Sequence, residues 1–281
     1  MKRYTRILKA ILPPVLVSLC RRRGSDESPY GFTGSFPTWA AAQNASRGYA
    51  APEILESMLA AALRVKRGQA ACERDTVCLP DIEYSWPLMA GLMWAAAQSA
   101  GELRVLDFGG ALGTTYFQSR RFLAGLRHLS WGVVEQPHVV QAGREQLADG
   151  TLRFYPDIDA CCREIHPNVV VFASVLQYLE HPYAVLEQCF ARQVPFLLID
   201  RTPFADSAAD RICVQRVPPV IYNGSYPAWV FSRSRFTDCL AHREVVAEFD
   251  STIGNPMPGC VLKGFIVRTG ETPIPAREAA L

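Results

Sequence analysis

The chain has 281 residues, of which 49% are hydrophobic, so it can bury one sizeable core. The 29 Lys and Arg residues nearly balance the 27 Asp and Glu residues, and a formal net charge of +2 gives no global field that would favour nucleic acid as a partner. The nine cysteines include no CxxC pair, which excludes the usual zinc and thioredoxin-like spacings and predicts no metal site. Free cysteines in apolar patterns suit a reducing compartment, so we expect a cytoplasmic protein.

Residues 1–23 form a basic segment in which Lys and Arg flank an apolar run and no acid occurs. The run is too short to span a bilayer, which needs about 20 apolar residues. A signal peptide is disfavoured because Pro13 and Pro14 interrupt the run and Arg21–Arg23 replace a small-residue cleavage site. Two interpretations stay open: peripheral contact of this segment with the inner face of the membrane, and a terminal helix that is frayed or packs on the domain.

Residues 24–100 predict a helical N-terminal extension, in which Gly, Pro and aromatic residues precede the regular patterns. Tyr30, Trp39 and Tyr49 of this extension are candidates for a lid over a binding site, and the alternative is that they pack the extension on the domain. The expected helices are Trp39–Ser46, Glu53–Lys66 and Trp86–Ser99.

From Leu103 onward, short apolar runs alternate with helical patterns, which is typical of a parallel sheet with crossover helices. The expected strands are Arg104–Phe108, Ser130–Glu135, Thr151–Tyr155, Asn168–Ala173 and Pro195–Asp200. The expected helices are Thr114–Leu126, His138–Ala148 and Pro182–Ala191, followed by Phe236–Ala241.

Two final runs, Glu244–Phe249 and Val261–Arg268, predict a C-terminal antiparallel hairpin. The fold class predicted is therefore α/β, a three-layer α/β/α sandwich with a mostly parallel seven-stranded sheet. This domain is expected at residues 101–270, with an insertion at 202–234 and a tail at 271–281.

A glycine-rich turn follows the first expected strand in the segment RVLDFGGALGTT. A turn of this kind directs backbone N–H groups at a ligand at the carboxyl edge of the sheet, and glycine permits close approach and unusual dihedral angles. The dinucleotide fingerprint GxGxxG does not fit, because its third and sixth positions hold Ala111 and Thr114, and this argues against NAD. The candidate ligand-binding residues here are Asp107, Gly109, Gly110, Ala111 and Gly113.

Polar residues follow the next three expected strands at the same edge. Glu135 ends the second strand, where a carboxylate can accept hydrogen bonds from both hydroxyls of a ribose; NAD enzymes place an acid similarly. Asp157 and Ile158 follow the third strand, where a solvated turn Asp is the alternative interpretation. Ser174 follows the fourth strand.

The segment DFGGALG resembles the first motif of class I, Rossmann-like methyltransferases that use S-adenosylmethionine (SAM), an acid followed by GxGxG, with Ala111 in place of the central glycine. The resemblance covers about residues 103–200 and implies SAM as the cofactor. It also implies that Glu135 binds the ribose, that Asp157 and Ile158 border the adenine, and that Ser174 occupies the loop of the fourth motif.

More narrowly, the segments GFTGSFPTWAAAQNASRGY, VLDFGGALG and VLQYL are similar to a family of bacterial methyltransferases associated with surface-polysaccharide gene sets. Membership would imply the same fold and cofactor and a place in polysaccharide biosynthesis. That family offers no secure substrate.

Because a sulfonium methyl group is already electrophilic, such an enzyme mainly has to hold the nucleophile in line with it. If the acceptor is a hydroxyl, His181 is the candidate general base, since it follows the fourth strand. The alternative is that His181 only precedes Pro182 at the start of a helix.

Candidate acceptor-binding residues come from the end of the fifth strand and from the insertion. Asp200 and Arg201 could orient an acceptor, or could form a structural ion pair. Tyr222, Tyr226 and Trp229 could form an aromatic wall with polar tips, or could belong to the core.

The sequence thus predicts a SAM-dependent methyltransferase that acts on a small molecule or glycan precursor, at oxygen. One alternative is a non-catalytic methyltransferase-fold scaffold or membrane-surface adaptor, which Ala111 and the basic N-terminus suggest. A second alternative, an NAD-dependent nucleotide-sugar enzyme, would need the GxGxxG fingerprint near the first strand. The sequence determines neither the acceptor nor the oligomeric state.

Overall fold

The computed structural model describes residues 30–48, 52–74, 76–218, 221, 224–254 and 259–270. The basic segment 1–23, the tail 271–281 and two aromatic candidates, Tyr49 and Tyr222, lie outside these ranges.

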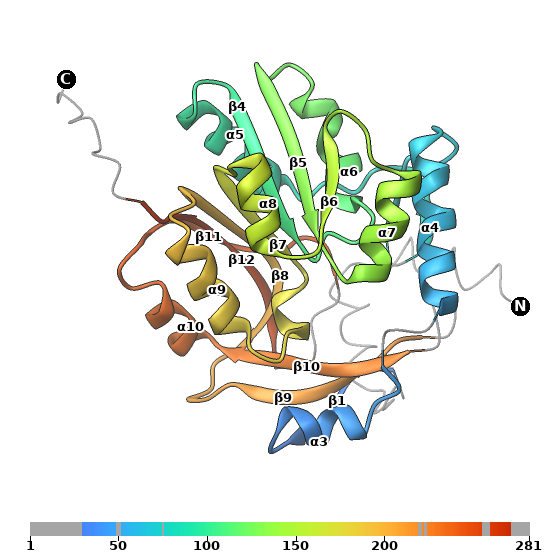
Figure 1. The fold of residues 1–281 in the computed structure, drawn as a ribbon. Helices are drawn as coiled ribbons and strands as arrows, with labels where there is room; N and C mark the ends of the chain where they lie inside the picture. Colours follow the sequence, from blue (N-terminus) through green and yellow to red (C-terminus); the bar gives the residue numbers. More distant parts are fainter. Residues whose placement is uncertain are drawn as a thin grey trace, which may run out of the picture.

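A seven-stranded central sheet forms the middle of the molecule (Figure 1). Five of its strands are parallel, and the two C-terminal strands form an antiparallel hairpin that pairs with the fifth. The predicted mostly parallel sheet with a C-terminal hairpin is therefore confirmed. In spatial order the strands are β6 (Leu152–Tyr155), β5 (His128–Val134), β4 (Glu102–Phe108), β7 (Val169–Ala173), β8 (Phe196–Ala205), β12 (Val261–Arg268) and β11 (Glu244–Asp250).

Helices cover both faces of this sheet, which gives the predicted three layers (Figure 1). Side chains of neighbouring residues in one strand point to opposite faces of the sheet. Val105 packs with the helices of one face and Leu106 with those of the other. This burial on both faces explains why the strands are continuously apolar. One face carries α4 (Pro52–Lys66), α5 (Trp86–Gln98), α6 (Thr114–Leu123) and α7 (Pro137–Gln146), and the other carries α8 (Ile158–Ile165), α9 (Pro182–Ala191) and α10 (Arg233–Cys239).

A second, antiparallel sheet crosses the C-terminal ends of the central strands (Figure 1). It consists of β1 (Gly31–Phe36), β9 (Arg211–Arg216) and β10 (Ser225–Ser232), with β9 in the middle. The two sheets are continuous, because β8 extends past Asp200 and its residues Phe204 and Ala205 pair with β10. The insertion at 202–234 is therefore largely strand, and a segment of the N-terminal extension pairs with it.

Short elements complete this region. Helix α3 (Trp39–Asn44) packs Ala42 against Ile212 and Val214, on the outer side of the second sheet. A hairpin of β2 (Cys72–Arg74) and β3 (Val77–Leu79) follows α4, so the extension is not only helical as predicted. None of the helices within the described ranges is long and apolar enough to cross a bilayer.

Candidate functional site

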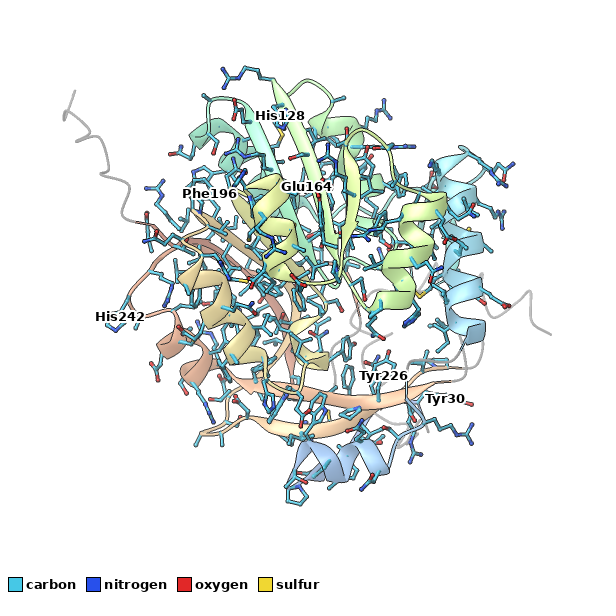
Figure 2. The ribbon with its side chains drawn as sticks, in the orientation of Figure 1. Tyr30, His128, Glu164, Phe196, Tyr226 and His242 are labelled. Atoms are coloured by element: carbon cyan, nitrogen blue, oxygen red, sulfur yellow. The ribbon has the colours of Figure 1, made fainter. Side chains whose placement is uncertain are left out.

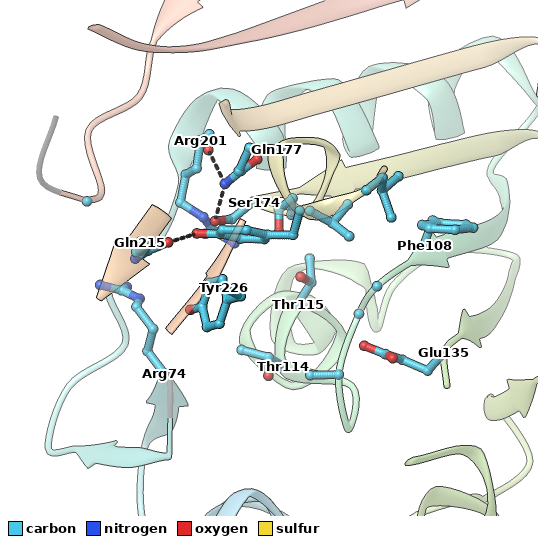
Figure 3. Close-up of a pocket in the computed structure, with 18 of the residues that line it drawn as sticks. Arg74, Phe108, Thr114, Thr115, Glu135, Ser174, Gln177, Arg201, Gln215 and Tyr226 are labelled. Carbon is cyan, nitrogen blue, oxygen red and sulfur yellow. Dashed lines mark hydrogen bonds between the residues drawn. The ribbon is translucent and has the colours of Figure 1, made fainter. Parts of the chain in front are cut away.

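A cavity of about 2440 Å³ lies between the C-terminal edge of the central sheet and the second sheet (Figure 3). Its lining comes from the turn after β4, the ends of β5, β6, β7 and β8, the β2–β3 hairpin, and strands β1, β9 and β10. Figure 2 shows Tyr226 and Tyr30 at one end of the second sheet, on the side of this opening. Ligand pockets usually occupy about 300–1,000 Å³, so the cavity has room for more than one small molecule.

The turn after β4 is built around residues with positive φ. Gly109 has φ 67° and Gly113 has φ 90°. A Cβ atom added to Gly109 would stand 2.9 Å from the Cβ atom of Val175, so glycine is required here by the protein's own packing. The sequence analysis attributed this glycine to the close approach of a ligand. In the structure the close approach is that of Val175, in the segment after β7.

Ala111 replaces a glycine of the resembled motif and adopts φ 51°. This left-handed conformation costs an L-residue about 1–2 kcal/mol. The alanine therefore keeps the backbone course of the turn at some cost in strain, and it lines the cavity together with Gly109 and Gly110.

Asp107 lies beneath the turn and does not line the cavity. Its side chain is fully buried, and its Oδ2 atom accepts a hydrogen bond of 3.0 Å from Nε1 of Trp131. Burial raises the pKa of Asp107 to about 7, and the Trp131 hydrogen bond and the positive charge of Arg201 partly oppose this rise. Gly113, which also lies outside the lining, is the N-cap of α6.

Glu135 directly follows β5 and lines the cavity, and Figure 3 shows its carboxylate beside the turn after β4. Its Oε2 atom accepts a hydrogen bond of 2.8 Å from the backbone N–H of Gln136. Burial raises the pKa of Glu135, while hydrogen bonds from the backbone of Gln136 and Ala111 lower it. The carboxylate thus stands at the cavity wall with further acceptor capacity.

Asp157 and Ile158 line the same part of the cavity. Asp157 is the N-cap of α8, and its Oδ1 atom accepts a hydrogen bond of 2.6 Å from the backbone N–H of Ala160. Asp157 therefore has a structural role as a helix cap, and it also faces the cavity. Ile158 is buried.

Ser174 directly follows β7, and Arg201 lies within the neighbouring strand β8; both line the cavity and both have left-handed backbone, with φ 64° and 54°. Together with Ala111 they place three strained non-glycine residues around one cavity. Such strain is concentrated at functional sites, because the surrounding structure must hold it in place.

Gln177, in the short helix η1 (Leu176–Tyr178), links Ser174 with Arg201. Its Nε2 atom donates to Oγ of Ser174 at 3.1 Å and to the backbone oxygen of Arg201 at 3.3 Å (Figure 3). Gln177 is almost fully buried and lines the cavity. It was not among the predicted site residues, although it stands in the VLQYL segment that carried part of the resemblance.

Asp200 is fully buried and does not line the cavity. Its Oδ1 atom accepts hydrogen bonds from the backbone N–H of Arg201, at 2.8 Å, and from Oγ of Ser251, at 2.7 Å. The guanidinium of Arg201 instead donates to the backbone oxygen of Ala173 at 3.3 Å. Asp200 thus fixes the backbone of Arg201, whose side chain reaches the cavity.

Tyr226 lines the cavity and packs edge-to-face on Tyr178, with 5.1 Å between ring centroids. The hydroxyl of Tyr178 donates to Oε1 of Gln215 at 2.6 Å, which joins η1 to β9 (Figure 3). Trp229 does not line this cavity: it stacks on Trp39 at 5.8 Å and its Nε1 atom donates to the backbone oxygen of Leu179. Tyr226 and Trp229 are three residues apart in one strand, and alternation places such residues on opposite faces.

His181 lies outside the cavity. It is exposed at the N-cap of α9 and borders a separate, smaller hollow of about 680 Å³. Its role as a general base stays a prediction. Of the three aromatic candidates for a lid, Tyr30 lines the cavity, Trp39 packs on Trp229, and Tyr49 lies outside the described residues.

The β2–β3 hairpin adds two charged residues that sequence reasoning missed. Glu73, largely buried, accepts a hydrogen bond from the hydroxyl of Thr114 at the start of α6, where negative charge is favoured by the helix dipole. Arg74 donates from Nη1 to Oε2 of Glu83 at 2.7 Å. A three-residue strand has too short a pattern to be read from the sequence.

No protein-family model matches this chain, and no curated protein matches it either. Among solved structures, it is similar to the 1,6-didemethyltoxoflavin-N1-methyltransferase of Burkholderia thailandensis with bound 1,6-didemethyltoxoflavin and S-adenosylhomocysteine (SAH), at 15% identity over 87% of this chain and 97% of that one, with a TM-score of 0.45. It is also similar to the N-terminal domain of EvdMO1 in the presence of SAH and D-fucose, at 16% identity over 79% of this chain and 98% of that one, with a TM-score of 0.45.

A third similar structure is the magnesium protoporphyrin IX methyltransferase of Synechocystis PCC 6803 with bound SAM, at 11% identity over 79% of this chain and 99% of that one, with a TM-score of 0.43.

Proposed function

We propose that this chain is a SAM-dependent methyltransferase that transfers a methyl group to an oxygen atom of a small molecule or glycan precursor. The observation that carries the proposal is that two different groups of residues line the two sides of one large cavity. One side holds the turn after β4, Glu135 and Asp157, and the other holds Tyr178, Gln215 and Tyr226.

The first side fits the donor. Glu135 has acceptor capacity for the two hydroxyls of a ribose, and the neighbouring backbone of Gly109–Ala111 borders the cavity without large side chains. Asp157 and Ile158 would border the adenine. When bound, SAM supplies an electrophilic methyl group, so the protein's main task is to position the acceptor.

The second side fits the acceptor. Tyr226 presents a ring with a polar tip, and Arg201 reaches the cavity from within β8. The second sheet covers the ends of the central strands, where it would exclude water from the reacting groups.

Binding of the donor is tested by calorimetric titration of the full chain with SAH, the product of methyl transfer. We expect saturable binding, weakened about tenfold or more in Glu135→Gln, because a hydrogen bond to a charged group contributes about 1.5–3 kcal/mol. The matched control is Glu145→Gln, an exposed glutamate on α7 outside the cavity, which should bind normally. Absence of SAH binding at millimolar concentration would remove the donor from the proposal, and a parallel titration with NAD tests the dinucleotide alternative.

Catalysis is tested separately from binding. The chain is incubated with SAM that carries a radiolabelled methyl group and with a small-molecule extract of cells, and label should move into an extractable product. Donor binding without any transfer would favour the non-catalytic scaffold.

A further inference from the structure

Two polar side chains that line the cavity carry buried atoms with no hydrogen-bond partner in the described part of the chain. One atom is the amide oxygen of Gln177, and the others belong to the guanidinium group of Arg74. In Arg74 they are Nε and Nη2, which together hold most of its N–H donors. A buried donor without a partner is costly and rare, and a ligand that brings acceptors to this position accounts for it.

The protein partner of Arg74 occupies a different corner of the guanidinium group. Nη1 donates to Oε2 of Glu83 at 2.7 Å, and the side chain of Glu83 is 58% exposed. An ion pair with so exposed a carboxylate contributes little. The N–H bonds of Nε and Nη2 run parallel along the other edge, which can hold both oxygens of one carboxylate. This edge therefore suits a planar ligand group with two acceptor oxygens.

The β2–β3 hairpin holds Arg74 between the turn after β4 and the second sheet. On one side Glu73 accepts a hydrogen bond from the hydroxyl of Thr114, which starts α6 directly after the turn. On the other side Oγ1 of Thr76 donates to the backbone oxygen of Ile221, in the loop between β9 and β10, at 3.1 Å. Because side chains alternate along a strand, Arg74 faces away from the contact that Glu73 makes with α6.

Glu135 and Arg74 lie on opposite sides of the turn after β4. In Figure 3 Glu135 is on one side of Thr114, and Arg74 extends from the hairpin on the other side, toward Tyr226. With its ribose at Glu135, a donor that follows the backbone of the turn brings its far end toward Arg74. The far end of SAM and of SAH is an amino acid, whose α-carboxylate is a planar pair of oxygens.

We propose that Nε and Nη2 of Arg74 bind the α-carboxylate of the donor. This rests on the proposed function, because it assigns a further residue to the donor that the same cavity holds. The sulfur atom of the donor lies between its ribose and its amino acid. Contacts at Glu135 and at Arg74 therefore fix the reacting centre from both ends, which is the positioning that methyl transfer needs.

The test measures by calorimetry how the full chain binds three adenosine ligands. SAH carries the whole amino acid, S-adenosyl-3-thiopropylamine lacks only its carboxylate, and 5′-methylthioadenosine lacks the amino acid altogether. We expect SAH to bind at least about tenfold more tightly than the thiopropylamine, because the charge-assisted hydrogen bonds are lost with the carboxylate.

Variants assign this difference to Arg74. Arg74→Gln should weaken SAH binding about tenfold or more and leave binding of the other two ligands unchanged, which also shows that the variant is folded. Arg74→Lys keeps the charge but loses the paired donors, so it should restore only part of the affinity. Glu83→Gln breaks the same ion pair and keeps Arg74, so it should bind SAH normally. Arg121→Gln, an exposed arginine of α6 outside the cavity, is the control.

Equal affinity of SAH and the thiopropylamine for the wild type would overturn the proposal. Two other results would also overturn it: Arg74→Gln weakens all three ligands alike, or Glu83→Gln weakens SAH as much as Arg74→Gln does, since the ion pair is then structural. Failure of the proposed function looks different, because none of the three ligands then binds at millimolar concentration. SAH binding that does not depend on Arg74 leaves the methyltransferase proposal standing and removes only the role of Arg74.

Discussion

The close contact between the turn after β4 and the segment after β7 can be tested by adding one methyl group, in Gly109→Ala. Two effects oppose the change. Gly109 has φ 67°, in the left-handed region, and a Cβ atom there would stand 2.9 Å from the Cβ atom of Val175 and still nearer to one of its methyl carbons. Atoms this close must move apart, so either the turn or the segment that carries Ser174 and Gln177 has to shift.

The expected loss of stability follows from these two effects. Left-handed backbone costs an alanine about 1–2 kcal/mol, and overpacking typically costs about 1–3 kcal/mol, so the free energy of unfolding should fall by about 2–5 kcal/mol. Because the turn lines the cavity, SAH binding should weaken as well, even at temperatures where the variant remains folded.

Urea unfolding followed by circular dichroism measures the first effect. The companion variants are Val175→Ala, which removes the crowded methyl groups, and the double variant Gly109→Ala with Val175→Ala. Removing the Val175 methyl groups should relieve the overlap with the added Cβ atom, so the double variant should be about 1–3 kcal/mol more stable than the sum of the two single effects predicts. The cost of the left-handed backbone at position 109 should remain in the double variant. Additive effects in the cycle, or a loss below about 0.5 kcal/mol in Gly109→Ala, would show that the two segments are not in the contact described here.

Two further variants of the β4 region test the backbone strain at Ala111 and the burial of the Asp107 carboxyl group. Ala111→Gly should raise the free energy of unfolding by up to about 1 kcal/mol, since glycine tolerates the φ of 51°; a loss of stability on urea unfolding would contradict this conformation. For Asp107, burial raises the pKa from its ordinary value of 3.8 to about 7, so the folded chain holds a proton that the unfolded chain releases between these values. Stability should therefore fall as pH rises through this window, by at most about 1.4 kcal/mol per pH unit, and Asp107→Asn should be stabilised relative to the wild type between about pH 5 and about pH 8. If the difference in free energy of unfolding between Asp107→Asn and the wild type is the same at both pH values, Asp107 is already ionised at the lower one and its pKa is not raised.

The predicted site residues did not all converge on the cavity. Glu135, Asp157, Ile158 and Ser174 line it because each stands at or just after the carboxyl end of a parallel strand, and these ends meet at one edge of a sheet. His181 also follows such a strand, yet the short helix η1 carries the chain away from the cavity before the residue is reached.

The side of the cavity that carries Tyr226 was harder to predict, because its geometry depends on a sheet whose strands come from distant parts of the sequence. Gly31 pairs with Arg216, and that pairing joins the N-terminal extension to the insertion. Without knowing that residues 225–232 form a strand, the aromatic residues Tyr226 and Trp229 could be read as one wall. In a strand they alternate, so one faces the cavity and the other faces Trp39.

By itself the sequence determined the central sheet, the chain order of its strands and helices, and the placing of Glu135, Asp157 and Ser174 at one edge of that sheet. Those features depend on apolar periodicity and on turns that lie next to their strands, which are local properties of the chain. Only the tertiary structure decided the second sheet, the β2–β3 hairpin, the exclusion of His181 from the cavity and the hydrogen bonds of Gln177 to Ser174 and Arg201. These depend on which strands pair and which side chains find partners across long sequence separations, and neither leaves a pattern within any one segment.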